Sequence, residues 1–173
     1  MIELWALRMA EGIKRRTPDH PASIAVMKHA LAILINTTSI IILSLTLGIT
    51  LGHGWKTAIA LTAFALLRMV TGGVHVKTGM MCVLITTGLF VLIALIEVER
   101  AGIYVLTLLS FIMVFLWAPA GIEKQSRIPK HFYPHLRYAA AFLVLGSLLV
   151  MSETVALCFF IQSLTLFPVR ERR

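Results

Sequence analysis

The chain alternates between long apolar runs and short polar segments. Six runs are candidate membrane spans, and they cover residues 29–51, 55–70, 80–98, 102–117, 138–152 and 154–167. A transmembrane helix needs roughly 20 apolar residues, within a range of about 17–25. The last two runs fall short of that length, and Ser152 and Glu153 form the turn between them. The pattern predicts an all-α, polytopic membrane protein with about six transmembrane helices.

The N-terminal segment, residues 1–16, has the pattern of an amphipathic helix. It ends in a basic cluster at 14–16, and its apolar members are Ile2, Leu4, Trp5, Met9 and Ile13. This combination is typical of a helix that lies on a membrane surface. Two prolines within 17–21 end the helix. We therefore expect an interfacial helix at 1–16 and a transmembrane bundle at 29–168, within a single membrane-embedded domain that spans residues 1–173.

Composition agrees with a membrane protein and argues against a nucleic-acid-binding protein. Hydrophobic residues make up 58% of the chain and charged residues 14%, whereas soluble domains average about 45–50% and about 25%. The net charge of +8 would suit nucleic-acid binding. However, the basic residues lie between the apolar runs, where membrane proteins carry them. We therefore expect no nucleic-acid partner.

The distribution of basic residues also predicts the orientation. In a six-span arrangement with both termini on one side, that side carries all of the 16 lysines and arginines except Lys56 and Arg100. Cytoplasmic loops carry the excess of lysine and arginine in membrane proteins. We therefore expect both termini, Arg68 and His75 at the cytoplasmic face, with Cys82 just inside the third span.

Candidate chemistry is concentrated in one glycine-rich segment between the second and third apolar runs. It combines cations, glycines, an imidazole and a thiol: Arg68, Gly72, Gly73, His75, Lys77, Gly79 and Cys82. A thiol and an imidazole are the minimum parts for nucleophilic catalysis. If the segment is catalytic, Cys82 would be the nucleophile and His75 its natural base, and Arg68 and Lys77 could supply positive potential, because the reactive species is the thiolate.

The spacing of His75 and Cys82 constrains the backbone between them. In one straight helix the two residues would lie about 10.5 Å apart along the axis, whereas a nucleophile and its base need a separation of about 2.6–3.2 Å. The pair can work together only if the chain folds back, which glycines permit. We predict a turn or re-entrant piece that is buried in protein and open to the cytoplasm. The alternative is an ordinary cytoplasmic loop in which Cys82 only fills space.

The segment contains no acidic residue to orient the imidazole. A backbone carbonyl or the side chain of Thr71, Thr78, Asn36 or Gln162 would have to do so, and the sequence does not choose among them. Asn36 and Gln162 are polar residues inside apolar runs, where each needs a partner. They either join helices together or line the cavity of the site.

Three further features have simpler interpretations. Cys158 is expected to be a packing residue. His131 and His135 have the spacing of metal ligands on a helix, but Pro134 interrupts it, and we expect neither a metal nor a cofactor. Gly48 and Gly52 have the spacing of a helix-dimer motif, with a role beside the loop as the alternative. We expect a homodimer.

At the glycine-rich segment the chain resembles the AgrB family, the membrane cysteine peptidases of Gram-positive quorum sensing. The resemblance rests on Arg68, the Gly72-Gly73-x-His75 motif and Cys82. Two weaker stretches look similar as well. They are Ala118-Pro119 with the charged linker up to Pro129, and the C-terminal stretch 162–168. The similarity therefore runs from about the second span to the end of the chain.

The resemblance implies an activity at the cytoplasmic face of a bacterial plasma membrane. Proteins of this family cleave a short, amphipathic, AgrD-like propeptide through an acyl-enzyme thioester and cyclise it to a thiolactone or lactone. Carried over to this chain, Cys82 is the nucleophile and His75 the general base. The residues implied to bind substrate or support the site are Arg68, Gly72, Gly73, Lys77 and Gln162. Membrane lipids are the other expected partner, and backbone N–H groups near Cys82 are candidates for the oxyanion hole.

Two other classes of function remain open from the sequence. In one, the protein is a small permease or transport accessory whose glycine-rich turn is a gate. In the other, it is a structural membrane subunit without chemistry.

Overall fold

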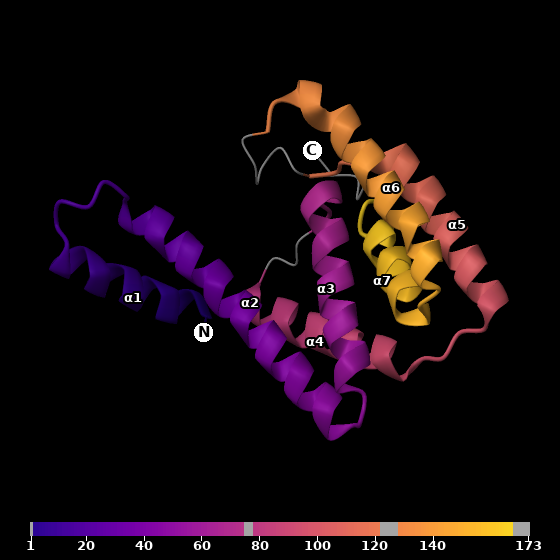
Figure 1. Ribbon diagram of the computed structural model, residues 1–173. Coiled ribbons are helices and arrows are strands. Elements are labelled where there is room, and N and C mark those ends of the chain that lie inside the picture. Colours follow the sequence, from indigo (N-terminus) through magenta and orange to yellow (C-terminus); the bar gives the residue numbers. More distant parts are fainter. Residues whose placement is uncertain (1, 75–77, 122–127, 168–173) are drawn as a thin grey trace.

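The computed structural model describes residues 2–74, 78–121 and 128–167, and the regular structure of this part is helical (Figure 1). The elements are α1 (Ile2–Arg16), α2 (Ile24–Thr50), α3 (Gly54–Thr71), α4 (Gly79–Leu95), α5 (Arg100–Trp117), the short 3-10 helix η2 (Lys130–Phe132), α6 (Tyr133–Val150) and α7 (Glu153–Leu164). The predicted all-α class is confirmed, and each of the predicted apolar runs overlaps with one helix.

Side-chain caps explain where two of these helices begin. α2 starts at Ile24, earlier than the predicted run, because the Ser23 hydroxyl accepts a hydrogen bond from the Val26 N–H at 3.3 Å. α7 starts at Glu153, where the Ser152 hydroxyl accepts from the Val155 N–H at 3.5 Å. Ser152 thus closes the turn between α6 and α7, as the sequence predicted.

The described helices differ in whether they are long enough to cross a membrane. Three stretches have the required length and apolar composition, and they are Ile24–Thr50, Arg100–Trp117 and Lys130–Val150. α4 and α7 are apolar but shorter. The 12 residues of α7 extend about 18 Å, less than the roughly 30 Å thickness of the hydrocarbon core. The chain is a membrane protein, and the count of six spans stays a prediction.

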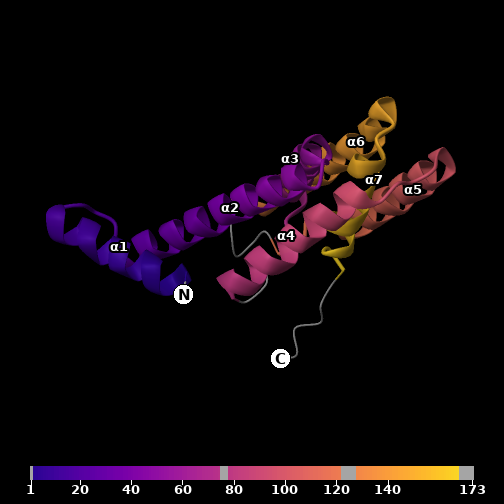
Figure 2. The same cartoon turned by 90° about the horizontal axis from the view of Figure 1, so that it is seen from below.

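The predicted N-terminal helix packs along the first half of α2. Small side chains lie at the contact, since Ala6 and Ala10 are completely buried. Larger apolar side chains, among them Trp5 and Met9, remain exposed. Figures 1 and 2 show that α1 and the N-terminal part of α2 extend away from the other helices, whereas the rest of α2 packs on α4 and α3. α1 therefore offers one face to α2 and keeps an apolar face for another environment, as a helix at a membrane surface requires.

The short helix α7 lies inside the bundle. It packs on α3 and α5, with further contacts to α4 and α6, and Figure 1 shows it next to α3 and α6. Cys158 and Phe159 of α7 belong to the hydrophobic core, together with Leu67 of α3 and Val114 of α5. Because its neighbours surround it, the polar residues of α7 must find partners within the protein.

One ion pair and one hydrogen bond join three elements at one end of the bundle. Lys56 Nζ of α3 lies 2.6 Å from Glu153 Oε1 of α7, and Glu153 Oε2 accepts from the Val98 N–H, between α4 and α5, at 2.9 Å. The start of α3, the end of α4 and the start of α7 therefore lie together. The C-terminal ends of α3, α5 and α7 lie at the opposite end of the bundle.

Gly48 allows α2 and α3 to approach closely. A Cβ atom at this position would overlap the Thr57 hydroxyl and lie 2.7 Å from Thr57 Cβ. Gly52 lies in the turn between the same two helices. Gly48 thus serves a contact within one chain, whereas a Cβ on Gly52 would meet nothing within 4 Å. The homodimer stays a prediction.

Gly48→Ala should lower the thermal unfolding midpoint in detergent, because overpacking of this kind costs about 1–3 kcal/mol. Gly146→Ala is the matched control: it also adds a methyl group inside a helix, but a Cβ there meets nothing within 4 Å. Differential scanning fluorimetry of both variants measures the contrast. An equal midpoint for the two would show that the α2–α3 contact does not need glycine.

Candidate active site

Cys82 lies in the first turn of α4. The N-cap residue, Thr78, is extended (φ −118°, ψ 134°), and its carbonyl accepts a hydrogen bond from the Cys82 N–H at 3.0 Å. The thiol is therefore close to the N-terminal end of a helix, where the backbone dipole favours an anion. Because Thr78 is extended, residues 75–82 do not form one continuous helix, in agreement with the predicted break.

Two polar side chains lie beside the half-buried Cys82 thiol. The Asn36 amide nitrogen Nδ2, from α2, lies 3.6 Å from Sγ, and the Thr86 hydroxyl lies 3.9 Å from it. Asn36 was visible in the sequence as a polar residue that needed a partner, and that partner is the thiol. Sequence reasoning missed Thr86, although a spacing of four residues places it on the same helix face as Cys82.

The glycine pair after α3 forms a turn that other residues would strain. Gly72 and Gly73 have φ values of 72° and 123°, which glycine adopts without steric cost. A Cβ atom on Gly73 would lie 2.5 Å from the Thr165 hydroxyl oxygen and 3.3 Å from Gln162 Nε2. Backbone conformation and close packing therefore both require glycine at position 73.

The completely buried Gln162 side chain holds this turn from α7. Its Nε2 donates to the Gly72 carbonyl at 2.7 Å and to the Thr71 hydroxyl at 3.1 Å. Its Oε1 accepts from Arg68 Nη1 at 3.3 Å, and Arg68 Nη2 donates to the Val74 carbonyl at 2.9 Å. The structure thus brings together four residues that the sequence singled out: Arg68, Gly72, Gly73 and Gln162.

Two distant stretches of backbone bond to the same turn. Ala120, which follows α5, donates to the Thr71 carbonyl at 2.9 Å and accepts from the Gly73 N–H at 2.8 Å. The Val74 N–H donates to the carbonyl of Thr165, which follows α7, at 3.2 Å. Residue 74, directly before the histidine, is therefore held through both its N–H and its carbonyl. Sequence reasoning missed Ala120 and Thr165 individually, although both lie in or beside stretches that resembled the family.

His75 and Lys77 lie outside the described residues, as does the charged linker at 122–127. The pairing of His75 with Cys82 and the role of Lys77 therefore stay predictions. The described residues do narrow the choice of a group that orients the imidazole. Thr71 donates to the Leu67 carbonyl at 2.8 Å and accepts from Gln162. The side chains of Thr71 and Gln162, two of the four candidates, therefore already have hydrogen-bond partners at the turn.

The second cysteine and the histidine pair lie away from this cluster. Cys158 is completely buried in the core, and its thiol donates to the Ala60 carbonyl at 3.5 Å, which confirms a packing role. His131 lies in η2, whereas His135 lies in α6. The described residues contain no group of three or more side chains suited to hold a metal ion.

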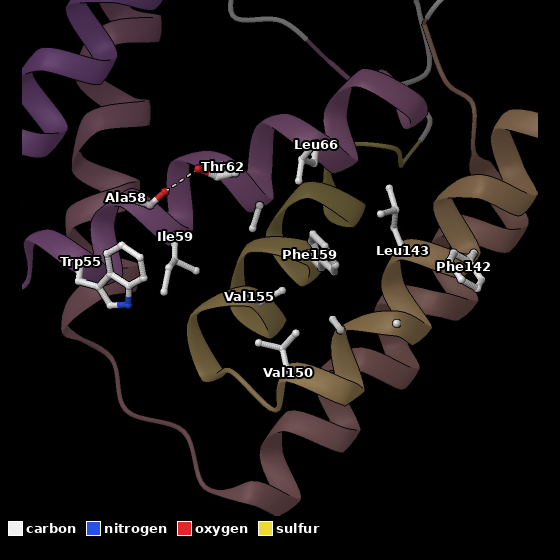
Figure 3. A pocket seen from close by; sticks show the side chains of 13 residues that line it. Trp55, Ala58, Ile59, Thr62, Leu66, Phe142, Leu143, Val150, Val155 and Phe159 are labelled. Carbon is white, nitrogen blue, oxygen red and sulfur yellow. Dashed lines mark hydrogen bonds between the residues drawn. The ribbon is translucent and has the colours of Figure 1, made fainter.

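A groove between α3 and α6 is separate from the cluster as well (Figure 3). Its lining is almost entirely apolar, and it includes Trp55 of α3, Phe142 of α6 and Phe159 of α7. The Thr62 hydroxyl in the lining is occupied, because it donates to the Ala58 carbonyl at 2.9 Å. The groove therefore offers apolar surface, and none of the predicted site residues line it.

The fold and the site together define a helical membrane protein with a thiol at a helix N-terminus and a glycine turn before it in the chain. We call residues 71–74 the clamped turn, because Gln162, Arg68, Ala120 and Thr165 hold them by hydrogen bonds. From residue 6 to residue 167 the sequence matches the family described as Accessory gene regulator B, and the chain belongs to this AgrB family. No curated protein and no solved structure matches it. Family membership supports a role in the processing of quorum-sensing peptides.

Gly73→Ala should destabilise the turn, since a strained backbone conformation costs on the order of 1–3 kcal/mol and the added methyl group meets Thr165. Gly79→Ala is the control, because a Cβ there makes only ordinary contacts at 3.5 Å. We expect faster hydrogen exchange at the amides of residues 73 and 74 in the first variant only. Unchanged exchange in Gly73→Ala would contradict the requirement for glycine.

Proposed function

We propose that this protein is a membrane cysteine endopeptidase that cleaves a quorum-sensing propeptide and cyclises it to a thiolactone or lactone. The observation that carries the proposal is the placement of Cys82. Its half-buried thiol lies in the first turn of a helix, with two polar side chains beside it. The clamped turn that leads to His75 precedes it in the chain.

The reaction has two acyl-transfer steps. His75 takes the thiol proton, and Cys82 Sγ forms a bond to the carbon of the scissile carbonyl. The C–N bond then breaks, the proton passes from His75 to the amine of the departing tail, and a thioester remains. A thiol or hydroxyl within the bound peptide next attacks this thioester, closes the ring and releases the Cys82 thiol. Ring closure competes well with hydrolysis, because a tethered nucleophile has a high effective concentration.

The position of Cys82 supports this chemistry electrostatically. The positive end of the α4 dipole stabilises negative charge on the thiolate. The N–H groups of Gly79, Met80 and Met81 precede the first bonded amide of the helix, so they lack partners within α4. They can donate to the negative oxygen of a tetrahedral intermediate.

Arg68 and Gln162 are assigned a supporting role. The guanidinium bonds the Val74 carbonyl and the Gln162 side chain, so two of its nitrogens are already engaged within the protein. These bonds favour positioning of the segment before His75 over contact with a substrate carboxylate. Gly72 and Gly73 form the turn itself, and Lys77 is proposed to contact the substrate.

The proposed topology has six spans, with both termini and the site on the cytoplasmic side of a bacterial plasma membrane. The ion pair of Lys56 and Glu153 marks one end of the bundle, and the clamped turn marks the other. Lys56 and Arg100, the two basic residues assigned to the outer side, belong to elements at the first end. This separation agrees with the positive-inside rule.

The proposed substrate is a short amphipathic propeptide of the AgrD type. Its helix would share the membrane surface with α1, whose exposed apolar side chains include Trp5 and Met9. Membrane lipids contact the same face. A homodimer is proposed as the assembly. Chemical crosslinking of the protein in membranes tests it, and a crosslinked species of twice the monomer mass is the expected result.

Cys82→Ala and His75→Ala should each abolish processing of a co-expressed AgrD-like propeptide, with a loss of at least about 10³-fold, because removal of a nucleophile or its base disables the whole catalytic unit. Mass spectrometry of the peptide products measures cleavage and ring closure separately. Cys158→Ala is the matched cysteine control, and it should retain processing because Cys158 only packs in the core. Cleavage by folded Cys82→Ala at the wild-type rate would refute the proposed function.

A further inference from the structure

Asn36 is placed against the proposed nucleophile by the packing of α2 on α4. It lies in the middle of α2, 46 residues before Cys82 in the chain, and its Nδ2 is 3.6 Å from Sγ. A carboxamide within an apolar helix is costly unless it has partners. Its partner here is a thiol, which is a weak hydrogen-bond acceptor.

The other end of the carboxamide is also not accounted for by packing. Asn36 Oδ1 is buried and has no hydrogen-bond partner among the described residues. A buried polar atom without a partner costs about 1–3 kcal/mol, so packing between the described helices does not by itself account for a carboxamide at this position. A carboxamide that only joined two helices would be expected to bond at both ends.

The site needs a hydrogen-bond donor beside Sγ that the backbone of Cys82 does not supply. The Cys82 N–H is already bonded to the Thr78 carbonyl at 3.0 Å. The amides of residues 79–81, which lack partners within α4, lie at the start of the helix, on the N-terminal side of the thiol. Asn36 Nδ2 approaches the sulfur from a different helix.

We propose that Asn36 is a catalytic residue that stabilises the oxyanion, and this inference rests on the proposed peptidase function. When Cys82 Sγ bonds to the scissile carbon, the π electron pair of the carbonyl moves onto its oxygen. That oxygen lies one bond from the carbon attached to Sγ, within the space beside the sulfur. The Asn36 Nδ2–H donates to it there. The electron pair returns to re-form the carbonyl as the C–N bond breaks.

The Thr86 hydroxyl is the competing donor, because its oxygen lies 3.9 Å from Cys82 Sγ. Thr86 belongs to α4 itself and lies one turn deeper than Cys82. A Cβ atom on Gly79, the first residue of α4, would lie 3.5 Å from Asn36 Oδ1, so Asn36 lies nearer than Thr86 to the N-terminal edge of the site, where the substrate is proposed to enter. Thr86→Val therefore serves as the comparison variant.

The test measures two rates in the Cys158→Ala background, so that Cys82 is the only thiol. One is the rate of thioester formation with an AgrD-like propeptide in a single turnover, followed by mass spectrometry. The other is the alkylation rate of Cys82 by iodoacetamide across a pH range, which reports the thiolate and needs no oxyanion hole. The variants are Asn36→Ala and Asn36→Leu, with exposed Thr38→Ala as the control on the same helix.

Both Asn36 variants should form the thioester about 10²–10³-fold more slowly, as expected for loss of one oxyanion donor. The slower thioester formation should persist at the high-pH plateau of the alkylation profile, where the thiolate is fully formed in every variant, because stabilisation of the oxyanion is separate from stabilisation of the thiolate. Asn36→Leu guards against a folding defect, because an apolar side chain of similar size suits an apolar helix and leaves no unpaired amide. Thr38→Ala should leave both rates unchanged.

Three results would overturn the assignment. The first is thioester formation by folded Asn36→Leu at the parent rate while Cys82→Ala is inactive, which would leave the peptidase function intact. The second is a loss of thioester formation that disappears at the high-pH plateau of the alkylation profile, which would place the whole effect of Asn36 on the thiolate. The third is a comparable loss in Thr86→Val with none in the Asn36 variants. Processing by Cys82→Ala would instead remove the proposed function itself.

Discussion

The need to satisfy backbone hydrogen bonds in apolar surroundings governs the structure around the glycine turn. Where the chain leaves α3 at Thr71, its N–H and carbonyl groups lose their helical partners, and little water is available at a buried position. Gln162, Arg68, Ala120 and Thr165 replace those partners through the bonds to residues 71–74. Thr71, Gly72 and Gly73 are buried, so without these bonds their backbone groups would be left unpaired.

This constraint explains why the short helix α7 lies inside the bundle. At 12 residues it is too short to cross a membrane alone, yet it carries a completely buried glutamine to the turn. The Lys56–Glu153 pair anchors the start of α7, and the core contacts of Phe159 fix its rotation. The packing of the bundle and the shape of the site therefore depend on the same helix.

The described site consists of two parts on either side of residues 75–77. One part is the clamped turn up to Val74, and the other is Cys82 with Asn36 and Thr86. Preorganised groups contribute most to acyl transfer, because they do not have to reorganise as charge develops. In the proposed function, the hydrogen-bonded turn on one side and a helix N-terminus on the other would position the proposed base, His75, and the proposed nucleophile, Cys82.

The sequence by itself determined the helical class, the approximate limits of the helices and the candidate residues. It could do so because apolar runs and glycine motifs are local patterns. Helix geometry also predicted a break before Cys82, on the condition that His75 and Cys82 work as a pair. Only the tertiary structure decided the partners: Arg68 and Gln162 lie 94 residues apart, and Asn36 and Cys82 lie 46 apart. Contacts of this kind arise from how whole helices pack, and no local pattern encodes them.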